Sequence, residues 1–101
     1  MKLLIVTCLK EHLADVARIF KQANIDVFST NEITGHRTGN QSNHLEDWFA
    51  SGGELAESMM IFTFTPSENA VHGLELIKAN NISIKKDFPV RAFIMPVEQA
   101  I

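Results

Sequence analysis

A strand and a helix follow one another in ESMMIFTFTPSENAVHGLELI, residues 57–77. Residues 57–65 have the composition of a strand, and Pro66 ends it. Ser67 then begins a helix with a polar first turn, and Gly73 weakens this helix by roughly 1 kcal/mol relative to alanine. In the strand, one side holds Ile61, Thr63 and Thr65, and the other holds Met60, Phe62 and Phe64. The expected apolar face of the helix consists of Ala70, Val71, Leu74 and Ile77.

The same order of strand and helix occurs at the start of the chain. Residues 2–9, KLLIVTCL, form a nearly continuous apolar run that suits a central strand covered on at least one face. Apolar residues then recur at spacings of three and four from Leu13 to Phe20, which predicts an amphipathic helix. Asn24 stands where a left-handed cap would end that helix.

Two further strands complete the expected sheet. Residues 25–34, IDVFSTNEIT, alternate, with Ile25, Val27 and Ser29 on one side. Residues 90–95 form the last strand, and Pro96 marks its end or an edge. We therefore predict an α+β fold of ferredoxin-like βαββαβ type. It has a four-stranded antiparallel sheet, two helices on one face and a long loop between the second and third strands.

Size and charge limit the classes of function. A chain of 101 residues suits one domain, and its small core suggests that it associates with other copies. The net charge of −3 argues against a nucleic-acid partner, which needs a concentrated positive face. A sheet that binds RNA would also need exposed aromatic side chains. Phe62 and Phe64 are the candidates, and we expect both to pack in the core instead.

Cysteine content and hydropathy indicate a cytoplasmic protein. The single cysteine, Cys8, allows no internal disulfide, and we expect it to be a buried, inert thiol. No apolar run approaches the ~20 residues of a membrane helix, so we expect no insertion into a membrane.

The long segment between the second and third strands, about 36–56, does not belong to the scaffold. Loops beyond ~12–15 residues are usually functional or disordered. This one contains most of the glycines, the only tryptophan and a central stretch, 45–49, with large apolar side chains. One interpretation is a mobile recognition loop that presents His44, Trp48 and Phe49 to a partner. The alternative is a helical turn packed on the protein's own surface or on a neighbouring subunit.

Several short motifs, in matching order and at matching distances, resemble the PII signalling proteins over nearly the whole chain. The motifs are Leu13-Ala14-Asp15-Val16, Thr30-Asn31-Glu32-Ile33-Thr34-Gly35, Gly35-His36-Arg37-Thr38-Gly39 and Val90-Arg91-Ala92-Phe93-Ile94-Met95-Pro96-Val97-Glu98. The third motif is similar to the opening of the family's flexible T-loop.

The resemblance implies a regulatory protein that binds rather than catalyses. It implies a homotrimer with a small-molecule effector in the clefts between subunits, and a T-loop (about 36–56) that docks onto a membrane transporter or an enzyme. The ligand-binding positions that it implies are Ser29, Gly35, Arg37, Gly39, Lys86 and Arg91. Arg91 takes the place of a family lysine that contacts phosphate. The alternative for Arg91 is a pair with an acidic neighbour on the sheet.

Departures from the family pattern leave the cofactor unassigned. The chain has no tyrosine that could be nucleotidylated, and Arg37 replaces a glutamine that helps to hold a metal ion. Ile84-Lys85-Lys86-Asp87-Phe88-Pro89 replaces the glycine-rich phosphate loop, so an adenine nucleotide lacks its usual cradle.

Two other classes stay open as alternatives. The first is a metal-binding or metal-tolerance protein, similar to the CutA family or to an accessory of a heavy-metal efflux pump. Its candidate ligands are His36, His44 and Asp47, with Cys8, His12 and His72 as further donors, but none shows a metal-ligand spacing. The second is a trimer with a purely structural role. No nucleophile or acid–base pair has a recognisable context, so we do not expect an enzyme.

Overall fold

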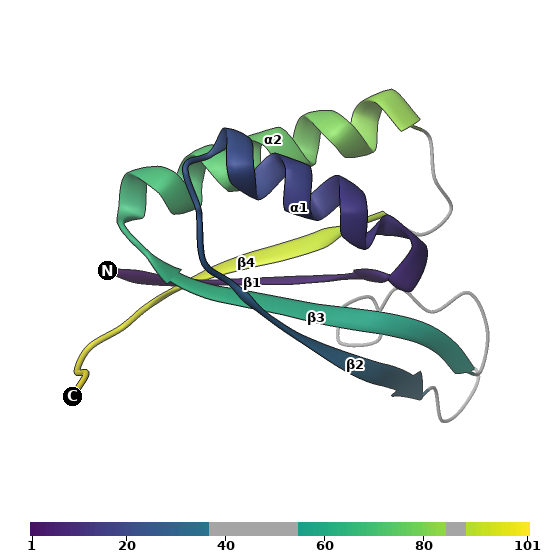
Figure 1. The fold of residues 1–101 in the computed structure, drawn as a ribbon, viewed down its shortest axis with the longest axis horizontal. Helices are drawn as coiled ribbons and strands as arrows, with labels where there is room; N and C mark the ends of the chain where they lie inside the picture. Colours follow the sequence, from purple (N-terminus) through teal and green to yellow (C-terminus); the bar gives the residue numbers. More distant parts are fainter. Residues whose placement is uncertain (37–54, 85–88) are drawn as a thin grey trace.

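The computed structural model describes residues 1–36, 55–84 and 89–101. The elements follow one another as β1 (Lys2–Leu9), a 3-10 turn η1 (Lys10–His12), α1 (Leu13–Gln22), β2 (Ser29–His36), β3 (Leu55–Thr65), α2 (Ser67–Ile84) and β4 (Arg91–Pro96). Figure 1 shows both helices lying across one side of the sheet.

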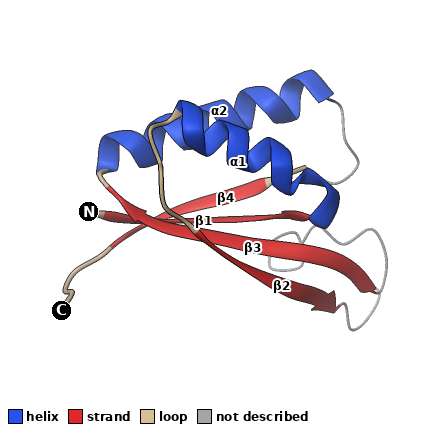
Figure 2. Ribbon diagram, viewed as in Figure 1, coloured by secondary structure: helices blue, strands red, loops and turns tan. Residues whose placement is uncertain are grey.

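The four strands form one antiparallel sheet in the order β2-β3-β1-β4. Strands β1 and β3 lie in the centre, and β2 and β4 form the two edges. Figure 2 shows that no described helix lies on the other side of the sheet. The predicted ferredoxin-like βαββαβ fold is therefore confirmed.

The core lies between the helices and the sheet. It is built from alternate residues of the central strands, which point toward the helices, and from one face of each helix. Its fully buried side chains include Leu4, Val6, Cys8, Ile61, Val16, Phe20, Ala70 and Ile77. Cys8 is buried, as predicted from its place in an apolar strand.

Helix α1 ends as the sequence predicts. Asn24 has φ of 60°, the left-handed conformation that asparagine tolerates better than most residues. The amide of Ile25 donates to the carbonyl of Phe20 over 2.8 Å, which closes the turn. The side chain of Ile25 is thereby turned into the core.

The second strand begins later than predicted. Its bounds are Ser29–His36 rather than 25–34, because Ile25 packs in the core as part of a connection. Val27 does not share its side: it is 80% exposed, and its carbonyl accepts a hydrogen bond of 2.6 Å from the Thr63 hydroxyl. With β2 reaching His36 and β3 starting at Leu55, the predicted 36–56 loop is shorter, because both strands extend into it.

Helix α2 packs through a slightly different face from the one predicted. Ala70 and Ile77 are buried as expected, but Val71 is 48% exposed, and Gly73 faces the core in its place. A Cβ at position 73 would lie 3.5 Å from side-chain carbons of both Ile25 and Leu4. The buried stripe therefore follows positions 70, 73 and 77, one helical face at spacings of three and four.

The end of α2 is tied to the start of β4. The Asn81 side-chain amide donates to the carbonyl of Val90 over 2.8 Å, and the Val90 amide donates to the Asn81 side-chain oxygen over 3.0 Å. This paired contact fixes where the last strand enters the sheet, next to β1. The register of β4 against β1, which pairs Arg91 with Thr7, then sets the side of the sheet on which Arg91 lies.

Candidate functional site

The predicted ligand residues that the structure describes lie on opposite edges of the sheet. Ser29 and Gly35 belong to β2, whereas Arg91 is the first residue of β4. Three inter-strand spacings separate the edge strands β2 and β4, so the distance between the two edges is roughly 14 Å. Ser29 and Gly35 are themselves six residues apart on one strand, roughly 20 Å. A single chain therefore does not bring these three residues together around one small ligand.

The other predicted residues lie outside the described part of the chain. These are Arg37, Gly39, His44, Asp47, Trp48, Phe49 and Lys86. The expected mobility of the T-loop also concerns residues outside the described ranges.

The uncovered side of the sheet, which we call the open face, is apolar across three strands. Strand pairing places the side chains of Leu3 and Ile5 on this face, beside Phe64 and Phe62 of β3 and Met95 and Phe93 of β4. Phe64 is 56% exposed and Met95 is 40% exposed. The expectation that Phe62 and Phe64 pack in the core is therefore wrong. Phe62 is half-buried, and it contacts Phe64 edge-to-face on the open face, with ring centroids 6.4 Å apart.

Arg91 is the only charged side chain on the open face among the described residues. It pairs with Thr7, which pairs in turn with Met60, and Met60 pairs with Asn31 of β2. This row, which is polar except for Met60, crosses the sheet at one end of the apolar rows. The Arg91 side chain is exposed and makes no ion pair or hydrogen bond with the described residues. The alternative prediction of an acidic neighbour for Arg91 finds no support in this part of the chain.

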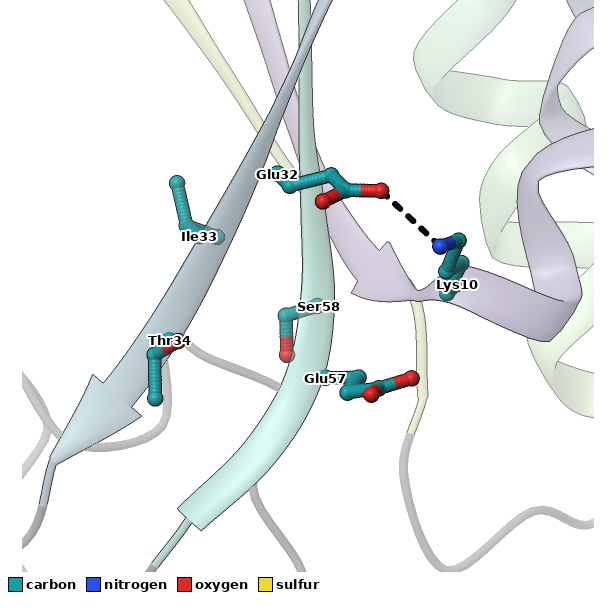
Figure 3. Close-up of a pocket in the computed structure, with 6 residues that line it drawn as sticks. All are labelled: Lys10, Glu32, Ile33, Thr34, Glu57 and Ser58. Carbon is teal, nitrogen blue, oxygen red and sulfur yellow. Dashed lines mark hydrogen bonds and ion pairs between the residues drawn. The ribbon is translucent and has the colours of Figure 1, made fainter.

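A hollow of about 340 Å³ lies on the other side of the sheet, where β2 and β3 run toward residues 37–54. Its lining is polar and comes from three elements: Lys10 of η1, Glu32, Ile33 and Thr34 of β2, and Glu57 and Ser58 of β3. Figure 3 shows Glu32 and Glu57 reaching toward Lys10, while Ile33 points away.

An ion pair closes one side of this hollow. The Lys10 ammonium donates to a Glu32 carboxylate oxygen over 2.8 Å. The hydrogen bond to Glu32 raises the pKa of Lys10 above its usual 10.5, with a smaller contribution from the charge of Glu57. The same hydrogen bond lowers the pKa of Glu32 below its usual 4.5. Both side chains are more than half exposed, so water and salt screen the pair.

Sequence reasoning missed this hollow. The sequence alone assigns no role to Lys10 or to Glu57. The signal that was available is alternation: Glu32 and Thr34 share a side of β2, and strand pairing sets Thr34 opposite Glu57. Only the register of β2 against β3, which the sequence leaves open, brings the residues to one place.

The described residues hold no group of three potential metal ligands. His36 is exposed at the end of β2, and His72 is exposed on α2. Cys8 lies in the core, and His12 is half-buried beside Glu11 at 3.7 Å. Within these residues, nothing assembles the metal site of the alternative interpretation.

Comparison with known proteins gives the class of fold. No family model and no curated protein matches the sequence. A solved structure from Thermus thermophilus, described as a candidate PII-like signalling protein, matches with a TM-score of 0.65 and 12% sequence identity. The match covers 95% of this chain and 85% of that one.

The PII-like fold that the sequence motifs indicated is therefore confirmed by a structure that shares only 12% of its residues with this chain. Among the described residues, no helix is long and apolar enough to cross a membrane.

Proposed function

We propose that this chain is a PII-like signal-transduction protein that acts by binding. In this proposal, copies of the chain assemble as a homotrimer, a small effector binds at the boundaries between subunits, and the segment around 36–56 contacts a protein partner such as a transporter or an enzyme. The fold shared with a candidate PII-like signalling protein supports the class.

The observation that carries the proposal is the placement of Ser29 and Arg91 on opposite edges of the sheet. One chain cannot bring both residues to a small ligand. In a closed ring of copies, the β4 edge of one subunit can face the β2 edge of the next, so the two sets of residues can meet at each boundary. The separation of Ser29 and Arg91 within one chain therefore fits a ligand site that is shared between two subunits.

The open face supports the assembly. A monomer rarely leaves a contiguous apolar sheet face in water, because such a patch usually marks a contact with another molecule. Phe62, Phe64 and Met95 give this face the large side chains that usually dominate protein contacts. A nucleic acid fits it less well, because Arg91 is the one cation that the described residues place there, and strand binding needs several.

The assembly is tested by sedimentation velocity at micromolar concentration. We expect a trimer for the wild type and a smaller species for Phe64→Asp, which places a charge in the centre of an apolar contact. Glu68→Asp on α2 is a matched surface control that should leave the trimer unchanged, because it lies at the start of a helix on the covered side. A monomeric wild type would remove the clefts and with them the proposal.

The effector is sought by a thermal-shift screen across nucleotides, 2-oxoglutarate, bicarbonate and divalent metals. A guanidinium offers paired donors to carboxylate or phosphate, and one charge-assisted contact contributes roughly 1.5–3 kcal/mol. Arg91→Ala should therefore weaken binding of an anionic hit by about ten- to a hundredfold and leave the assembly intact. Unchanged affinity in this variant would contradict the placement of the ligand beside Arg91.

A further inference from the structure

The hollow beside the Lys10–Glu32 ion pair contains more negative than positive charge. In its described lining, Lys10 is the only cation, and Glu32 and Glu57 are the two anions. The other described lining residues are uncharged, so the lining has one negative charge in excess at neutral pH. A ligand that complements this lining therefore carries a positive charge.

Glu57 is the carboxylate that is available to such a ligand. The Lys10 ammonium donates to an oxygen of Glu32 over 2.8 Å, whereas Glu57 makes no ion pair or hydrogen bond with the described residues. Figure 3 shows the Glu57 side chain reaching along the hollow toward Lys10. Its negative charge contributes to the raised pKa of Lys10. Glu57 is thus close enough to act on the Lys10 ammonium, but it is not held by it.

The register of β2 against β3 places the two carboxylates on the same side of the sheet. Glu57 lies opposite Thr34, and Glu32 is two residues from Thr34 on β2. Side chains in such a diagonal arrangement are roughly 7–8 Å apart, so one small ligand can contact both carboxylates. Thr34 is exposed on the same side, and its hydroxyl can accept a further hydrogen bond.

Size and charge define the class of ligand. A volume of about 340 Å³ is at the lower end of the range for ligand sites, which suits a small molecule. A divalent metal ion fits poorly, because the Lys10 ammonium beside the carboxylates repels it. The described residues also hold no group of three potential metal ligands. A guanidinium fits better, since its planar, paired donors match the two oxygens of one carboxylate.

We propose that this hollow binds a small organic cation of the guanidinium class, with Glu57 as its main partner and Glu32 and Thr34 as additional acceptors. The site lies within one chain and does not require assembly. None of the described ligand positions that the family resemblance implies lines it. It lies where β2 and β3 run toward residues 37–54, next to the segment that we propose to contact a partner. The chain would then have a second site, with the opposite preference for charge.

The probe is methylguanidinium, titrated into the isotope-labelled full chain at constant ionic strength while amide chemical shifts are recorded by NMR. We expect saturable shifts at the amides of Lys10, Thr34 and Glu57. The dissociation constant should be on the order of millimolar, because these side chains are partly in water. Methylurea has the same shape without the charge and should give no saturable shift at these amides. Methylammonium keeps the charge but lacks the paired donors, and should bind more weakly.

The carboxylate is tested by removing its charge alone. Glu57→Gln keeps the shape of the side chain and should weaken methylguanidinium binding by at least about tenfold, because a charge-assisted contact is lost. Glu75→Gln removes a carboxylate from the exposed pair with Lys78 on α2 and changes the net charge equally. This matched control should leave the dissociation constant unchanged.

The lysine should give the opposite effect. Lys10→Gln removes the cation that competes for the carboxylates, so methylguanidinium should bind about three- to tenfold more tightly. Lys78→Gln removes a lysine of the same charge from α2 and should have no effect on binding. A change caused only by the net charge of the chain would occur in both lysine variants.

Four results would overturn the site: no saturable shift in the wild type, equal shifts with methylurea, unchanged affinity in Glu57→Gln, or no tightening in Lys10→Gln. The first result also covers the cations outside the described residues, Arg37, Lys85 and Lys86, because any of them held in the hollow would exclude the probe. The proposed assembly is tested separately by sedimentation, so a trimer without methylguanidinium binding overturns only the site. A monomer that binds methylguanidinium overturns only the assembly.

Discussion

Strand β3 presents one set of side chains to the helices and another to the open face, and the two sets differ in an unexpected direction. The covered set includes Thr63 and Thr65, which are buried although they carry hydroxyls. The open set includes Phe62 and Phe64, and Phe64 is more than half exposed. The more apolar side of this strand is therefore the side that the helices leave uncovered.

The covered side tolerates Thr63 because the hydroxyl of this residue has a hydrogen-bond partner. The Thr63 hydroxyl donates to the Val27 carbonyl over 2.6 Å, so its burial leaves no unmade hydrogen bond. The open side has no such compensation for its aromatic rings. The comparison teaches that the helices cover the side toward which the chain crosses over. An exposed apolar patch of the kind left on the other side usually marks a contact with another molecule, which is the role that we propose for it.

The sharpest test of this comparison substitutes one residue on each side of β3. Ile61→Ala should lower the free energy of unfolding by about 2–5 kcal/mol, because Ile61 is fully buried under the helices and its loss leaves a cavity. Phe64→Ala should cost less than about 1 kcal/mol in the same assay, because much of its ring is already in water. Urea denaturation is run at a protein concentration where sedimentation shows a monomer.

Self-association should show the reverse order. Phe64→Ala should weaken it and Ile61→Ala should leave it unchanged, as long as that variant is folded by circular dichroism. Equal losses of folding stability at the two positions would mean that the open face is part of the core of a single chain, and the contrast between the sides would disappear.

The sequence predicts the order of elements well because local patterns determine it. The amphipathic period of residues 13–20 predicts helix α1, and Asn24 marks its left-handed cap. Pro66 and Ser67 mark the boundary between β3 and α2. Residues 25–28 were misassigned because Ile25 is apolar in either setting, as a strand residue or as a buried connection. Position 71 was misassigned because a small residue, Gly73, can face the sheet where the helix approaches closely.

The side of the sheet that is covered cannot be predicted from alternation here. Both sides of β1 are apolar, and in β3 alternation favours the wrong side. The hand of the two strand–helix–strand crossovers decides it, and that property belongs to the whole chain. For the same reason the sequence did not bring Lys10, Glu32 and Glu57 together, since they come from three elements whose register only the folded sheet fixes.

The packing of α2 on the covered side of the sheet can be tested at Gly73. A Cβ there would meet Ile25 and Leu4 at 3.5 Å, which is ordinary van der Waals contact and not a clash. Gly73→Ala should therefore raise the free energy of unfolding by up to about 1 kcal/mol, because alanine loses less conformational entropy in a helix. Thermal denaturation with Ala79→Gly, at an exposed site of the same helix, gives the opposite change as a control. A lower melting temperature for Gly73→Ala would show that the helix lies closer to the sheet than these distances allow.

The smallest effect is expected at the exposed ion pair on the rim of the covered side. Because Lys10 lowers the pKa of Glu32, the pair stabilises the fold above pH 4.5, and this contribution is lost as the pH falls through the lowered pKa. Because the pKa of Lys10 is raised, the contribution persists up to pH 10.5 and is lost above it.

Lys10→Gln should therefore be slightly less stable than the wild type at pH 7, and the difference should shrink as the pH is lowered through the lowered pKa of Glu32. Lys78→Gln, which removes a longer pair of 3.4 Å with Glu75 on α2, controls for the loss of a surface lysine. Urea midpoints at pH 7 and over an acid series measure both variants. A difference for Lys10→Gln that persists unchanged throughout the acid series would mean that its side chain contributes by packing, and that the charge pair at the edge of the hollow adds nothing to the fold.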